Sequence, residues 1–235
     1  RDKMTQIEQN VQIVLNKIEL LAEQIHKNPA EITLVAVTKT QSAETVNLAL
    51  KAGITHFGEN KVQEAIQKLP LITEPYTGFH FIGHLQTNKV KALMNLKPCL
   101  IHSVDSRHLA QAISEYAITQ NRMQDILLQV NTSGEASKHG IEPSQLISTA
   151  EEVSLLTAVR IKGLMTIGRL SDNAEDSRQD FRLLADLFKE LRSKQIPNLD
   201  MKWLSMGMTN DYEIAIEEGA NLVRIGSAIF GARQY

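Results

Sequence analysis

The chain has 235 residues, of which 43% are hydrophobic and 22% charged, a composition typical of soluble globular proteins. The formal net charge of -2 gives no electrostatic case for binding nucleic acid or an anionic membrane, and no apolar stretch approaches the length of a membrane span. The single cysteine, Cys99, excludes an internal disulfide. We therefore expect a cytoplasmic protein with neither a nucleic-acid nor a membrane partner.

Apolar residues recur at helical spacing over residues 3–27, which predicts a long amphipathic helix before the stop at residues 28–29. After it, short apolar runs alternate with helical segments. The expected strands cover residues 33–37, 54–57, 79–82, 100–103, 126–130, 161–165, 201–204 and 222–225. The expected helices cover about 42–52, 60–69, 88–96, 176–194 and 212–218, with others beginning near 106 and 143 and a short one after Gly226. The polar residues 171–178 indicate a mobile loop.

Eight strands alternating with helices predict parallel βαβ units. We expect an α/β protein made of a single (β/α)8 TIM barrel domain over residues 1–235, with the N-terminal helix as an addition. A doubly wound open sheet is the alternative. That fold uses a glycine-rich first turn, whereas residues 38–41 contain no glycine.

Lys39 lies just after the first expected strand, at the end of a barrel where active sites are built. Burial against apolar walls disfavours the charged form of an amine, and a neutral lysine amine can attack a carbonyl to form a Schiff base. A lone lysine at a strand end is more often a solvated surface residue. Other residues at the same end of the barrel must therefore decide between the two interpretations.

The loops after the last two strands suggest a phosphate site. Gly226 and Ser227 begin a short helix, where free backbone N–H groups favour an anion, and Ser205 could add a hydroxyl from the neighbouring strand. Tight turns alone would also explain these small residues. Arg224 lies in an apolar strand and needs a partner, which is either a structural ion pair, for example with Glu59, or a bound cofactor.

His84 follows the third strand and is either a ligand contact or a hydrogen-bonded scaffold residue. No histidine is paired with cysteine or carboxylates at the spacing of metal ligands along the chain, so we predict no metal.

Six segments resemble the pyridoxal phosphate homeostasis protein family, also called the YggS/PROSC family. They are LVAVTK (34–39), FGEN (57–60), HFIGHLQTNK (80–89), GLM (163–165), LSMGM (204–208) and VRIGSAIFG (223–231). The resemblance implies a fold type III barrel, similar to the N-terminal domain of alanine racemase, that holds pyridoxal 5′-phosphate (PLP) covalently on Lys39 as a Schiff base. It further implies that Ser205, Gly226 and Ser227 hold the phosphate, that Arg224 faces the pyridine nitrogen, and that Asn60 and Met165 lie near the ring.

The function implied by this resemblance is intracellular PLP (vitamin B6) and amino-acid homeostasis, without catalysis. A PLP-dependent racemase or decarboxylase is one alternative. Racemisation needs a second base, which alanine racemase takes from a C-terminal β-domain, and the chain ends at Tyr235, just after the expected barrel. A Schiff-base aldolase acting through Lys39 is the other alternative. The expected partners are PLP and, transiently, PLP-dependent apo-enzymes, and we expect a monomer.

Overall fold

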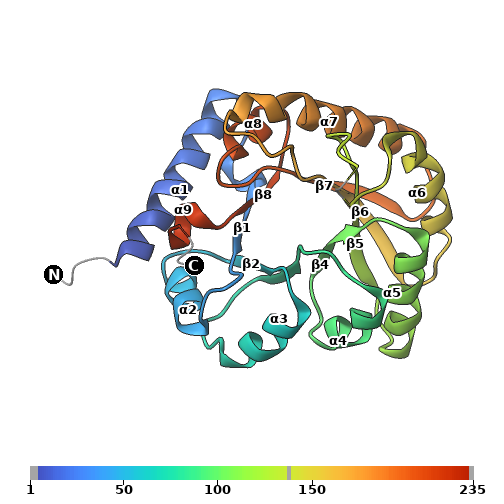
Figure 1. The fold of residues 1–235 in the computed structure, drawn as a ribbon, viewed down its shortest axis with the longest axis horizontal. Helices are drawn as coiled ribbons and strands as arrows, with labels where there is room; N and C mark the ends of the chain where they lie inside the picture. The colour runs from blue at the N-terminus through green and yellow to red at the C-terminus, as the bar shows by residue number, and fades with distance from the viewer. Residues whose placement is uncertain (1–4, 137–138, 233–235) are drawn as a thin grey trace.

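Eight parallel strands close into a barrel in the order β1 to β8 in the computed structural model, which describes residues 5–136 and 139–232. The strands form the inner ring and the helices surround them (Figure 1). The strands are β1 (Thr33–Val37), β2 (His56–Glu59), β3 (Gly78–Phe81), β4 (Leu100–Val104), β5 (Gln124–Gln129), β6 (Val159–Met165), β7 (Leu199–Ser205) and β8 (Leu222–Ile225). The predicted (β/α)8 barrel is confirmed, and the open sheet is excluded because β8 pairs with β1.

The helices follow the strands in strict alternation, as βαβ connections require. They are α1 (Gln6–Gln24), α2 (Ala43–Lys51), α3 (Val62–Lys68), α4 (Val90–Asn95), α5 (Arg107–Thr119), α6 (Leu146–Ser154), α7 (Arg178–Ser193), α8 (Tyr212–Glu217) and α9 (Ser227–Phe230). None of the helices in the described ranges is long and apolar enough to cross a bilayer.

The additional helix α1 begins with a capping box between Thr5 and Glu8 and packs outside the ring against α2, α8 and α9 (Figure 1). Asn10 donates its side-chain amide to the carbonyl of Ile229, 2.9 Å away, and Lys17 pairs with Glu213. Helix α1 therefore braces the two helices that flank β8.

Apolar side chains fill two separate spaces because successive strand residues point to opposite faces. The larger cluster lies between the strands and the helices. A smaller cluster joins strands on both sides of the ring, as side chains inside a barrel do; it contains Val35, Leu100, Leu127, Met165 and Leu222. Strands covered on both faces appear in sequence as continuous apolar runs, which is why they were predictable.

Strand β2 begins two residues later than predicted. The N–H of Ile54 bonds to the carbonyl of Ala49, 3.1 Å away, and Gly53 takes a positive φ of 116° between them. These contacts close the C-terminus of α2, so Ile54 belongs to the helix cap rather than to the strand.

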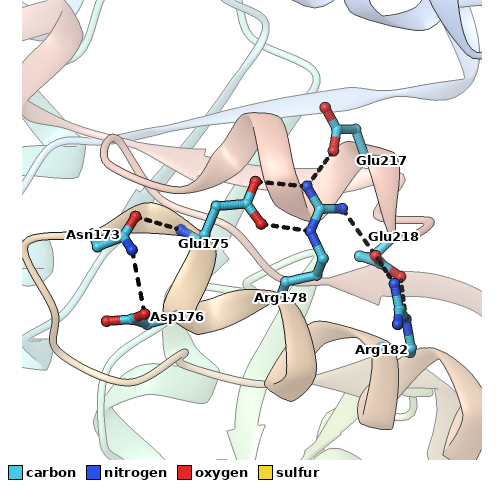
Figure 2. Close-up of polar contacts among 7 residues, drawn as sticks. All are labelled: Asn173, Glu175, Asp176, Arg178, Arg182, Glu217 and Glu218. Atoms are coloured by element: carbon cyan, nitrogen blue, oxygen red, sulfur yellow. Dashed lines mark hydrogen bonds and ion pairs between the residues drawn. The ribbon is translucent and has the colours of Figure 1, made fainter.

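The segment expected as a mobile loop is tied to its neighbours. Residues Ala174–Ser177 form a 3-10 helix, and Arg178 at the start of α7 binds Glu175, Glu217 and Glu218 (Figure 2). Arg182 adds a second contact to Glu218. Single exposed ion pairs contribute little, but this network joins α7 to the end of α8 and so fixes the chain that returns from β6.

Candidate functional site

A cavity of about 380 Å³ opens at the carboxyl ends of the strands, on the side formed by β1, β6, β7 and β8. This is within the range of small-molecule sites. Four predicted site residues line it together: Lys39, Arg224, Gly226 and Ser227. Lys39 and Arg224 line the same cavity because β1 and β8 are paired, with Val35 opposite Arg224 in register.

The turn that presents Lys39 is held from both sides. The hydroxyl of Thr38 donates to the carbonyl of Gly58 (3.1 Å) or to the Glu59 carboxylate (2.7 Å). Thr40 has a φ of 65°, which is strained for a β-branched residue, and its N–H bonds to Glu64. Strain of this kind persists only where the surroundings enforce it. The backbone around Lys39 is therefore fixed, and the side chain is half-buried.

A buried ion pair anchors this turn. The Lys68 ammonium lies 2.6 Å from Glu59 Oε1, 2.7 Å from the carbonyl of Thr38 and 3.0 Å from Glu64. Burial raises the pKa of Glu59, and the hydrogen bonds from Lys68 and Thr38 oppose that rise. The pair thus links α3 to the last residue before Lys39.

Arg224 points into the barrel and does not pair with Glu59. Its two terminal nitrogens donate to Ser205 Oγ (2.5 Å) and to the carbonyl of Thr166 (2.9 Å). Glu59 faces outward, to Lys68 on α3, so the alternative of an Arg224–Glu59 ion pair is wrong. Burial lowers the pKa of Arg224 to about 10, which leaves the guanidinium charged at neutral pH.

A chain of hydrogen bonds inside the barrel ends at Arg224. His56 Nδ1 lies 3.0 Å from His80 Nε2, His80 Nδ1 lies 2.9 Å from His102 Nε2, and His102 Nδ1 lies 2.9 Å from Ser205 Oγ. Burial lowers the pKa of all three histidines, that of His80 to about 3 and that of His102 well below its ordinary value. The three rings are therefore neutral at neutral pH. At one end of the chain, the Ser205 hydroxyl oxygen accepts a hydrogen bond from the Arg224 guanidinium.

This chain should make the fold sensitive to acid. An unfolded histidine takes up a proton near pH 6.5, whereas folded His80 resists protonation down to about pH 3. The contribution of His80 to the free energy of unfolding is therefore fully present above about pH 6.5 and is lost as the pH falls toward 3. At pH 5 the loss from His80 alone is about 2 kcal/mol. Urea unfolding at pH 5 and 7 measures the loss.

The exposed His108 provides the control for this experiment. His80→Asn should flatten the pH dependence of stability, and His108→Ala should leave it unchanged. An equal free energy of unfolding at both pH values in the parent protein would contradict the assignment.

Three predicted site residues lie outside the cavity lining. Ser205 is fully buried, with its hydroxyl bonded to His102 and Arg224. Met165 belongs to the apolar cluster inside the barrel. The side-chain oxygen of Asn60 is buried without a hydrogen-bond partner among the described residues.

Arg169 is a cavity residue that the sequence did not reveal. It follows β6, lines the cavity and forms a two-pronged pair with the buried Asp180, with its Nη2 2.7 Å and its Nε 3.1 Å from the carboxylate oxygens. The signal available in the sequence was its position in the loop after a strand of the barrel. The histidine chain also had a signal, since each of three consecutive strands carries one histidine.

The fold and the site define the class of this protein: a closed (β/α)8 barrel with a lysine and an arginine at one cavity in its mouth. Residues 8–234 match the family described as alanine racemase, N-terminal domain. An alanine racemase structure from Clostridium difficile 630 has the same fold, with a TM-score of 0.73 at 18% identity over 97% of this chain and 57% of that one.

Relatives of higher identity define the family more closely. The chain is 41% identical to the pyridoxal phosphate homeostasis protein of Aquifex aeolicus (strain VF5) over 222 residues, which are 94% of this chain and 96% of the relative. The structure of PipY from Synechococcus elongatus PCC7942 with PLP bound has a TM-score of 0.79 at 36% identity and covers 91% of this chain and 99% of PipY. The chain belongs to the pyridoxal phosphate homeostasis protein family.

Proposed function

We propose that this protein binds PLP in the cavity at the barrel mouth and acts in PLP and amino-acid homeostasis. The observation that carries the proposal is that Lys39 and Arg224 line one cavity beside the turn at Gly226 and Ser227. We further propose that residues 1–235 act as one cofactor-binding domain. The family match over residues 8–234 supports that extent.

The residues present fit this cofactor. PLP carries an aldehyde, a pyridine nitrogen and a phosphate, and it supplies the aldehyde for a Schiff base with an amine. Lys39 is the only lysine among the described residues that line the cavity. Gly226 and Ser227 line the same cavity at the N-terminus of α9, and this end of a helix favours a negatively charged group such as the phosphate.

Each of these residues has a separate proposed role. Lys39 holds the cofactor covalently, and Gly226 and Ser227 bind its phosphate. Arg224 faces the pyridine nitrogen. A guanidinium has five donors, so its bonds to Ser205 and Thr166 leave N–H groups for the cavity side. A cation at this position disfavours a protonated ring nitrogen and weakens the cofactor as an electron sink.

The other predicted residues act from below and beside the cavity. Because the Ser205 hydroxyl is bonded to His102 and Arg224, its support for cofactor binding acts first through the orientation of the guanidinium. Met165 contributes to the apolar interior beneath the ring. Asn60 has a buried oxygen that could accept a hydrogen bond from the cofactor.

We also propose that the protein does not catalyse a PLP reaction. Racemisation requires a second base facing the lysine across the substrate. The titratable cavity residues in the described part of the chain are Lys39, Arg169, Asp211 and Arg224. Both arginines are cations, and Asp211 is buried and accepts a hydrogen bond from the N–H of Met208, 2.8 Å away. This arrangement supports retention of the cofactor rather than turnover.

The test of the function uses the purified protein saturated with PLP and then desalted. We expect a visible absorption band that borohydride removes, and no turnover in racemase and decarboxylase assays with several amino acids. Absence of the band would contradict PLP binding and favour an aldolase that acts on a sugar phosphate. A band accompanied by turnover would support the racemase or decarboxylase alternative.

A further inference from the structure

Three side chains with metal-binding atoms meet at the barrel rim opposite the cavity. His84, Asp105 and His139 come from the loops after β3, β4 and β5, and their ligand atoms all lie within 4.8 Å of one another. The cavity is lined from β1, β6, β7 and β8, so the closed strand order places the two sites on different sides of the mouth. These residues are distant in the sequence, which is why their spacing along the chain indicated no metal site.

The backbone on either side of His84 is fixed, although the side chain is exposed. Gly83 lies so close to the loop after β2 that a Cβ on it would fall 2.0 Å from the carbonyl oxygen of Asn60. Leu85, on the other side, is buried in the core. The position of His84 on the rim is therefore determined by packed neighbours.

The other two residues are anchored in the same manner. Asp105 stands between buried Val104 and Ser106, whose hydroxyl caps α5 by accepting from the N–H of Leu109. After His139, the chain joins β5 through a bridge in which the N–H of Ile141 bonds to the carbonyl of Gln129, 2.8 Å away. A backbone that is already held in place lowers the ordering cost of binding.

Two imidazoles and one carboxylate suit a borderline dication such as Zn²⁺ and leave a fourth position for water or another ligand. The rings of His84 and His139 stack with centroids 3.8 Å apart and planes 11° apart. A metal lies in the plane of each ring that ligates it, so one ring must rotate to share an ion with the other. Both histidine side chains are exposed and can move, and the ligand atoms must approach one another by at most about 1.5 Å to reach the spacing of a tetrahedral site.

We propose that His84, Asp105 and His139 form a binding site for a transition-metal dication of the Zn²⁺ class at the rim of the barrel. The site is independent of PLP binding, because none of the three residues lines the cavity. A bound ion would connect the loops after β3, β4 and β5.

Isothermal titration of the purified protein with ZnCl2 tests this proposal. We expect one Zn²⁺ ion to bind per chain. His84→Ala or His139→Ala should lower the affinity for Zn²⁺ by at least about tenfold, because losing even a residue that only hydrogen-bonds to a metal ligand lowers metal affinity by that factor. Asp105→Asn should weaken it in the same direction because the carboxylate charge is lost. Circular dichroism establishes that each variant is folded.

His108→Ala is the matched control, since His108 is an exposed histidine three residues beyond Asp105. It should leave Zn²⁺ binding unchanged. Equal weakening in His108→Ala and His84→Ala would indicate adventitious binding by surface histidines and overturn the proposal. Failure of the parent protein to bind Zn²⁺ would overturn it as well. Any bound PLP is present in the parent protein and in the variants alike. Binding of Zn²⁺ by PLP therefore cannot account for a difference in Zn²⁺ affinity between them.

Discussion

Lys39→Ala should abolish the visible absorption band that PLP gives with the parent protein. Lys39 has the only primary side-chain amine among the described cavity-lining residues, so no other residue there can form the Schiff base. Absorption after desalting measures the effect, and borohydride followed by peptide mapping should place a pyridoxyl group on the Lys39 peptide of the parent protein only.

Two further variants separate chemistry from charge and folding. Lys39→Arg keeps a cation but has no amine that forms a Schiff base, so it should lose the band as completely as Lys39→Ala. Lys194→Ala removes an exposed lysine at the C-terminus of α7 and should retain the band. A band that survives in Lys39→Ala would refute the covalent assignment.

Lys68→Met should destabilise the protein by about 3–5 kcal/mol, because it leaves the Glu59 carboxylate buried without its cation. It should also weaken PLP binding, since the Lys68 ammonium holds the carbonyl of Thr38 next to Lys39. Urea unfolding measures the first effect, and titration with PLP measures the second.

The control is Lys51→Met, which removes an exposed lysine 3.6 Å from Glu74 and should cost no more than about 1 kcal/mol. A second variant tests the cause. Glu59→Gln combined with Lys68→Met removes both charges and should be more stable than Lys68→Met alone. If Lys68→Met is as stable as Lys51→Met, the buried pair does not anchor the turn.

The barrel was predictable because most of its strands are buried on both faces. Strands β1 and β8 have the predicted bounds, 33–37 and 222–225, since polar or turn residues border their apolar runs. Strands β6 and β7 each begin two residues before the predicted start. The first residues of these two strands are partly exposed and include charged side chains, so the apolar pattern gives strands that are too short. Only the pairing with neighbouring strands shows where they begin.

The site was predictable where it depends on strand ends and not where it depends on orientation. Lys39 and Arg224 line one cavity because neighbouring parallel strands end at one edge. The partner of Glu59 depends on whether its side chain points into the barrel or toward a helix, and the sequence left this open. Residues such as His84 and His139, which meet across loops, leave no periodic signal at all.

The histidine chain also restricts where protons can lie inside the barrel. Arg224 can only donate, so Ser205 accepts from it, and each neutral ring has one N–H and one bare nitrogen. His56, His80 and His102 can therefore align only head to tail, in one of two senses. No ring can change its tautomer alone, so the histidine chain as a whole has two alternative proton arrangements. Its sense determines whether the Ser205 proton points to His102 or away from it.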